Sequence, residues 1–363
     1  MWIARHRYLL RLSRSGCGAN SLHEGRPVYN EGLPLVLRGK ADTPALLVAV
    51  QGILDRYEVL RTRLVSEDGR LYQQIDPVGI LKVHYEDWSA RGEAFASIER
   101  QAIDRCAEVI AAPYDLGMDH PCRSLVLKLS EELHVWCFAV HHSVGDNWSL
   151  SHVMPSDFFA LYEAARDGRS ADLPEISLHY ADYAAWQRSE AMAGILEQEL
   201  DWWKRHLNGA PEVLELPFDH ARPAERKHEG RRTETAGFTS EQWRAIEAYA
   251  VARGGTPFMV FVAALSGLLS RVTPSGDIVL GTPHVMKPDA ALWDEFGYFG
   301  NTLSLRTQVD HEETFNDLFD RAKGTVNDAF AHQYVPFEEI VAALGLRPVN
   351  ETPVFQVLLV MHA

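Results

Sequence analysis

Cysteine is scarce in this chain of 363 residues: there are 4, they are widely spaced, and none forms a C-x-x-C pair. This spacing excludes a disulfide framework and a cysteine-based zinc site, and it predicts reduced thiols in the cytoplasm. Long apolar runs are also missing. The longest one, 258–269, contains Ser266 and Gly267 and is too short to cross a bilayer, so no membrane association is expected.

Positive charge is in deficit, with 35 Lys and Arg against 50 Asp and Glu, a net charge of −15. Phosphate binding needs a cationic surface, so nucleic acid is not an expected partner. The sequence also has no G-x-x-x-x-G-K-[ST] loop, no G-x-G-x-x-G, no G-x-S-x-G and no H-E-x-x-H. No bound cofactor and no metal are therefore expected. Disorder is excluded by 15 Phe, 12 Tyr and 9 Trp, which supply a large core.

Strand and helix patterns interleave along the chain, which predicts a mixed α+β protein with two lobes. The expected strands are 33–37, 60–65, 71–75, 124–129, 134–140, 278–281, 302–309 and 354–361. The expected helices are 42–57, 92–111, 148–165, 180–207, 239–254, 314–331 and 336–344, with one more that begins at 256. The stretch 171–177 contains Pro174 and little periodicity, so we place the lobe boundary near residue 175, with lobes 29–175 and 176–363.

One motif follows the predicted strand 134–140 directly, and it reads His141-His142-Ser143-Val144-Gly145-Asp146. A strand that opens into a glycine-containing turn presents side chains on a rigid scaffold. Adjacent residues of an extended chain point to opposite faces, so His141 and His142 cannot do the same job. Asp146 could hold the turn or pair with a cation. Two structural histidines at a strand end, or a metal site with a further ligand, remain alternatives.

Together with four further segments, this motif resembles the condensation domains of nonribosomal peptide synthetases, in the chloramphenicol acetyltransferase-like superfamily. H-H-x-x-x-D followed by Asn147-Trp148-Ser149 is similar to the HHxxxDG core of that family. The other similar segments are 56–64 (RYEVLRTRL, like RHExLRTxF), 180–186 (YADYAAW, like YxDFAxW), 299–306 (FGNTLSLR, like FVNTxxxR) and 332–338 (HQYVPFE, like HQDYPFE). They occur in the family's order and cover about 29–361.

The resemblance implies two lobes in a V shape with an active-site tunnel between them. It implies amide bond formation between a donor acyl or peptidyl thioester and an acceptor aminoacyl thioester. Both would be carried on phosphopantetheine arms of donor and acceptor peptidyl carrier proteins, beside adenylation domains. No cofactor would be bound directly.

The resemblance also implies roles for individual residues. His142 is expected to manage the proton of the amine, as general base or by orienting it, and His141 to shape the turn. We predict that Asp146 pairs with Arg61 and fixes the turn. Asn147, Trp148 and Ser149 would support the site, and the backbone N–H of Ser143 or Val144 would stabilise an oxyanion. Asn301 would either bridge the lobes or bind substrate. Tyr183, Trp186 and Phe337 are interpreted as core residues.

Three departures from the family pattern bear on these expectations. Asn147 stands where the family has Gly, an opening SxAQxRLW is not recognisable before Tyr29, and the chain ends just after a segment like PLFQVMF. We therefore expect residues 1–28 to match poorly and the second lobe to be incomplete. The missing second aspartate of a heterocyclising DxxxxD motif favours an enzyme that joins L-donors to L-acceptors. A non-catalytic module that docks carrier proteins and an acyltransferase that uses acyl-CoA are the alternative functions.

Overall fold

A computed structural model describes residues 7–9, 29–68, 70–91, 95–219, 234, 236–346 and 353–361. The chain divides into two compact units. The first runs to Met192 and includes 287–299, and the second comprises 193–286 and 300 onward. The division falls later than the predicted boundary near residue 175. It does so because helix α5 (Tyr180–Trp186) packs in the first unit, where Tyr183 lies 4.9 Å from the ring of Phe299. The expected position of the SxAQxRLW motif lies outside the described residues.

A four-stranded sheet organises the described part of the first unit, in the order β2-β7-β6-β5. Its strands are β2 (Asn30–Arg38), β5 (His84–Asp87), β6 (Cys122–Ser130) and β7 (Leu133–His141). Strand β7 pairs antiparallel with β2 and β6, and β5 runs parallel to β6. Every residue of β7 is buried, which confirms the predicted strand and fixes the point at which the histidine motif begins.

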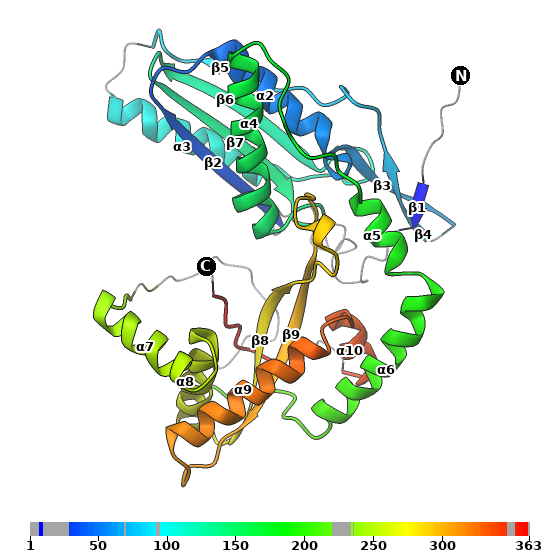
Figure 1. The fold of residues 1–363 in the computed structure, drawn as a ribbon, viewed down its shortest axis with the longest axis vertical. Helices are drawn as coiled ribbons and strands as arrows, with labels where there is room; N and C mark the ends of the chain where they lie inside the picture. The colour runs from blue at the N-terminus through cyan, green and yellow to red at the C-terminus, as the bar shows by residue number, and fades with distance from the viewer. Residues whose placement is uncertain are drawn as a thin grey trace. The chain divides into compact units, whose positions relative to one another are not determined.

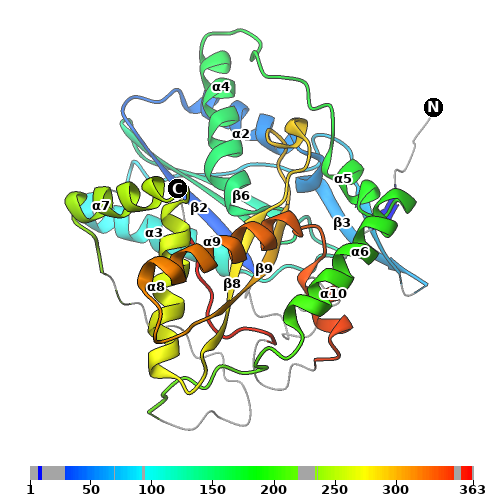
Figure 2. The same ribbon diagram turned by 60° about the horizontal axis from the view of Figure 1, so that its bottom comes forward.

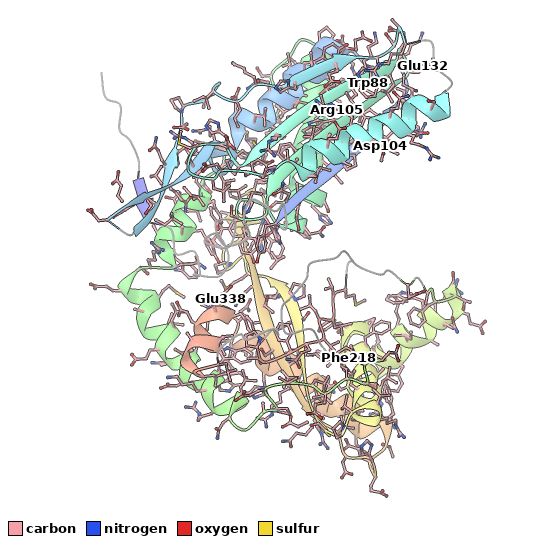
Figure 3. The ribbon with its side chains drawn as sticks, turned by 180° about the vertical axis from the view of Figure 1, so that it is seen from behind. Trp88, Asp104, Arg105, Glu132, Phe218 and Glu338 are labelled. Carbon is pink, nitrogen blue, oxygen red and sulfur yellow. The ribbon has the colours of Figure 1, made fainter. Side chains whose placement is uncertain are left out.

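Helices cover both faces of this sheet, with α3 (Phe95–Ala111) on one side and α2 (Thr43–Arg56) and α4 (Met154–Arg166) on the other (Figures 1 and 2). Successive side chains of a strand alternate between faces. Cys137 accordingly joins the apolar cluster under α3, while the ring of Trp136 lies 4.5 Å from that of Phe158 on α4. Arg105, labelled in Figure 3, reaches from α3 to Glu86 on β5 at 3.0 Å.

Local signals set several element boundaries as predicted. The side chain of Asp42 accepts a hydrogen bond from Ala45 N at 3.0 Å and begins α2. A 3₁₀ turn, η1 (Glu58–Arg61), leads into the predicted hairpin of β3 (Thr62–Glu67) and β4 (Arg70–Ile75). Strand β1 (Arg7–Leu9) pairs with β4 on its other edge.

Two predicted helices are interrupted. The helix expected over 148–165 begins as a π-helical turn, η2 (Ser149–Val153), before α4. The long helix expected over 180–207 is wrong as a single element, since α5 and α6 (Glu190–Leu207) are separate. Between them Arg188 N and Ser189 N donate to carbonyls only three residues back, and Ser189 Oγ accepts from Met192 N at 3.3 Å. A serine that caps the next helix thus competes with the continuing helical ladder.

In the second unit, strands β8 (Asp277–Val285) and β9 (Gly300–Gln308) pair antiparallel over their whole length. The helices of this unit are α6, α7 (Ser240–Ala252), α8 (Pro257–Val272), α9 (Phe315–Ala331) and α10 (Phe337–Ala343). Thr239 and Thr314, where the sequence predicts that two helices begin, cap α7 and α9 with reciprocal side-chain bonds. The connection from β8 to β9, which contains the 3₁₀ turn η3 (Ala290–Leu292), belongs to the first unit.

The strand predicted over 354–361 is reduced to one bridge. Gly281 N donates to Val357 O at 2.9 Å and Leu359 N donates to Gly281 O at 2.8 Å, but no ladder continues in the described residues. Phe355 lies so close to Gly281 that a Cβ there would be 2.3 Å from its ring, and Val354 has a φ of +74°. The segment therefore pairs with β8 in parallel at Gly281 alone, where the absence of a side chain leaves room for Phe355. Among the described residues no single helix has the length and hydropathy of a membrane span, although α7 and α8 pass as a pair bent by 99°.

Candidate active site

The two histidines of the motif leave β7 in different directions and have different surroundings. His141 is the last residue of the strand and is 1% exposed. Its Nδ1 lies 2.8 Å from Ser143 Oγ and accepts from Ser143 N at 3.2 Å, while its ring packs edge-on against Tyr114. Burial, reinforced by His142, lowers the pKa of His141 to about 4. His141 is therefore a neutral residue that shapes the turn.

His142 has a half-buried side chain, 34% exposed, and one committed nitrogen. Its Nδ1 lies 2.8 Å from the carbonyl oxygen of Gly145. A carbonyl only accepts hydrogen bonds, so Nδ1 carries the hydrogen and the neutral ring has its lone pair on Nε2. That nitrogen lies 3.5 Å from Glu31 Oε1, and the ring stands edge-on to Tyr298 at 5.0 Å. The arrangement gives a basic nitrogen of defined direction.

Gly145 makes this tautomer possible because the turn passes very close to Phe296. A Cβ on Gly145 would lie 2.9 Å from the Phe296 ring and 3.4 Å from Val140. Any larger residue would push the backbone away and move the carbonyl that holds His142 Nδ1.

Asp146 fixes the turn through the backbone, and the predicted ion pair with Arg61 is wrong. Its two carboxylate oxygens accept from Ser149 N at 2.8 Å and from Phe299 N at 3.0 Å. Arg61 instead donates to the carbonyl of Asp76 at 2.5 Å and lies 3.5 Å from Glu58. Backbone N–H groups satisfy the buried carboxylate, and the guanidinium ties η1 to the end of β4.

A second set of hydrogen bonds joins the turn to the segment 297–299. Ser149 Oγ donates to Gly297 O at 2.9 Å and accepts from Gly297 N at 3.1 Å. Asp146 N also donates to Gly297 O, at 3.2 Å. Sequence reasoning missed this partner because it lies about 150 residues downstream. The paired glycines around Phe299, at 297 and 300, were the available signal.

The oxyanion assignment to Ser143 and Val144 is not supported, because both N–H groups are engaged. Val144 N donates to His141 O at 3.0 Å, and Ser143 N donates to the His141 ring. Asn147 is exposed, accepts from Ser151 Oγ at 3.2 Å, and does not adopt a positive φ. Trp148 donates from Nε1 to Trp293 O at 3.3 Å and stacks on His152.

Two buried ionisable groups lie on the segment 287–299, behind Asp146. Lys287 donates to Glu295 O at 3.0 Å, and burial lowers its pKa to about 8, against the attraction of Asp146 and Glu295. Burial raises the pKa of Glu295 to about 8, against a hydrogen bond from Tyr180 N. Burial also raises the pKa of Glu31, and His142 opposes that rise. Burial is thus the main cause of the shifted pKa values of Lys287, Glu295 and Glu31.

Asn301, in the second unit, has every polar atom of its side chain engaged. Its Nδ2 donates to Gln333 O and Val335 O, both at 2.8 Å, and its Oδ1 accepts from Thr302 N and Phe337 N. These bonds hold the loop before α10 against β9. Of the residues interpreted as core, Tyr183 is buried, and Trp186 and Phe337 are partly buried. No described group of three His, Cys, Asp or Glu side chains is placed to hold a metal ion.

Comparisons with known proteins point to one family. The family model of the condensation domain matches residues 19–363, and so extends into the segment 1–28 that was predicted to match poorly. The phosphinothricin tripeptide synthetase PhsC from Streptomyces viridochromogenes is 34% identical over 344 residues. That alignment covers 94% of this chain and 31% of the relative, so the chain spans about a third of that protein. The dimodular nonribosomal peptide synthase from Bacillus subtilis is 32% identical over 343 residues, which cover 92% of this chain and 14% of that one.

Solved structures show the same fold. The X-domain from teicoplanin biosynthesis superimposes with a TM-score of 0.81 and 28% identity, over 98% of this chain and 78% of that one. That X-domain is also known in complex with OxyB. The first condensation domain of the CDA synthetase gives a TM-score of 0.75 at 19% identity, over 99% of this chain and 83% of that one, a likeness of fold alone.

Proposed function

Because the chain belongs to the condensation-domain family, we propose that it forms amide bonds in nonribosomal peptide biosynthesis. The donor is an acyl or peptidyl thioester and the acceptor is an aminoacyl thioester. Each is carried on the phosphopantetheine arm of a carrier protein. Adenylation domains that load those carriers are further partners, and the cytoplasm is the proposed location.

The observation that carries the proposal is the His142 ring, whose Nδ1 is held by Gly145 O and whose Nε2 belongs to a side chain that is 34% exposed. A thioester is already activated, so much of the rate comes from placing the two arms in contact. The remaining task is to remove a proton from the attacking amine. Histidine titrates near neutrality and suits its transfer.

The proposed step forms a C–N bond and breaks a C–S bond. The lone pair of the acceptor amine forms the C–N bond to the donor carbonyl, and the amine proton passes to His142 Nε2. The C–S bond breaks, and the leaving thiolate takes up the proton. His141 and Asp146 take no part in the transfer, because one is buried and neutral and the other is held by Ser149 N and Phe299 N.

A module that docks partner proteins without chemistry is the second candidate function. The likeness to the teicoplanin X-domain at 28% identity favours it, since that domain is known in complex with another protein, OxyB. Asn147 in place of the family's Gly also marks a departure at the motif.

The test is a condensation assay with the full chain and two phosphopantetheinylated carrier proteins. The donor carrier bears an acetyl group, and the acceptor carrier bears glycyl, alanyl or leucyl. Intact-protein mass spectrometry should find the amide on the acceptor carrier, at a rate well above the same mixture without the chain. A parallel mixture replaces the donor carrier with acetyl-CoA and should give no product.

Other outcomes overturn the proposal in distinct ways. Carrier binding without any amide over background would establish the docking module. Amide formation from acetyl-CoA and a free amine, with no carrier present, would establish a CoA-dependent acyltransferase instead.

A further inference from the structure

Glu31 is an acidic residue that lies beside the histidine motif but belongs to none of the sequence motifs. It lies on β2, opposite Val140 in the antiparallel pairing with β7. Side chains alternate along both strands, so Glu31 shares the face of Val140, and His142 two residues later comes to that same face. Its carboxylate ends 3.5 Å from His142 Nε2. The β2–β7 pairing register therefore brings an acidic side chain to Nε2 of His142, the ring nitrogen that Gly145 O does not bind.

The opposite face of β2 cannot take this role. Asn30 there donates to Ile110 O and Ala112 O at the end of α3, and a Cβ on Gly32 would lie 2.3 Å from Ile110. Glu31 points away from that packed face, with its side chain 35% exposed. It is thus accessible enough to change its charge state and close enough to His142 to respond to it.

Few other charges face His142. From its own turn come Asp146, held by two backbone N–H groups, and the neutral His141. From the segment 287–299 comes the ring of Tyr298. Burial raises the pKa of Glu31, His142 lowers it and Asp146 raises it, so the Glu31 carboxylate responds to the charge on the His142 ring. Glu31 is therefore the nearest described acid to the nitrogen that receives the proton.

We infer that Glu31 is a positioning residue that stabilises the imidazolium of His142 when Nε2 holds the amine proton. The expected effect of Glu31 on the reaction rate rests on the proposed function. The charge pair between Glu31 and His142 does not depend on that function. When the amine attacks, positive charge develops on the ring, and a carboxylate beside Nε2 compensates for it. A residue that acts in this way changes the pH dependence of the reaction, which a purely structural residue does not.

The test compares Glu31→Gln, which keeps the shape and removes the charge, with Glu31→Asp, which keeps the charge. Glu132→Gln is the matched control, because Glu132 lies exposed at the β6–β7 turn of the same sheet (Figure 3). The rate of amide formation is measured against pH in the two-carrier assay. In parallel, ¹³C-histidine NMR follows the His142 ring across the same pH range.

In Glu31→Gln the NMR titration midpoint of His142 and the acid limb of the rate profile should both move to lower pH by about one unit. The plateau kcat should fall about tenfold, with the acceptor KM within about twofold. Glu31→Asp should stay close to the unaltered chain in both the titration midpoint and the rate. Glu132→Gln should change neither.

A Glu31→Gln variant with an unmoved midpoint and an unchanged rate would overturn the inference. If the unaltered chain makes no amide, the proposed function fails, and the NMR midpoint alone still decides whether Glu31 stabilises the imidazolium.

Discussion

The turn after β7 in the first unit and the junction around Asn301 in the second hold their surroundings alike but leave different atoms available. Asn301 commits its whole amide to four backbone partners. Asp146 commits both oxygens to backbone N–H groups. His142 commits Nδ1 alone. Asn301 and Asp146 therefore use their polar side-chain atoms to hold backbone, whereas His142 keeps Nε2 for the proton transfer that we propose.

Asp146→Ala should have the largest effect on stability. It removes two hydrogen bonds to a charged acceptor and leaves the buried N–H groups of Ser149 and Phe299 without partners. The free energy of unfolding should fall by about 4 kcal/mol, because each such bond is worth roughly 1.5–3 kcal/mol. Urea unfolding measures it, with exposed Asp104→Ala on α3 as the control (Figure 3). A loss equal to that of the control would show that Asp146 does not hold the turn.

Asn301→Ala should cost less, about 2 kcal/mol, since its bonds are to neutral groups. Urea unfolding followed by circular dichroism reports the loss. Exposed Asn208→Ala is the control. At temperatures where the protein stays folded, amide formation should persist. A loss of turnover without a loss of stability would instead assign Asn301 to the substrate.

Glu295→Gln should have an effect that depends on pH and is smallest in acid. The folded pKa of about 8 lies above the ordinary value of 4.5, so the folded chain keeps its proton while the unfolded chain loses it. This contribution is complete below pH 4.5 and is lost as pH rises through 8. Glutamine stays neutral, so its advantage should grow by about 1 kcal/mol per pH unit from pH 6 to 8. Thermal unfolding measures it, and an advantage constant with pH would contradict the assigned titration.

Features set by neighbouring residues could be predicted from the sequence. Asp42, Thr239 and Thr314 cap their helices as their positions indicate, and the all-buried β7 follows from its run of strand formers. The family could also be predicted, because its short motifs occur in order along the chain. The family match to residues 19–363 confirms it.

Features set by distant residues could not be predicted. Asp146 accepts from Ser149 N and from the distant Phe299 N. The predicted pairing with Arg61 rested on charge, although backbone N–H groups satisfy a carboxylate equally well. Glu31 comes to His142 through the β2–β7 register, which a single sequence does not fix. The break at Ser189 depends on which of two competing hydrogen-bond patterns the packed chain selects, and the single bridge at Gly281 depends on how distant residues pack.

The most direct measurement is the single-turnover rate of amide formation by His142→Ala with both carriers loaded, beside exposed His84→Ala as control. If Nε2 of His142 takes the amine proton, the rate should fall at least about 100-fold while the urea midpoint stays unchanged. A His142→Ala protein that forms the amide within about twofold of the unaltered rate would contradict the account.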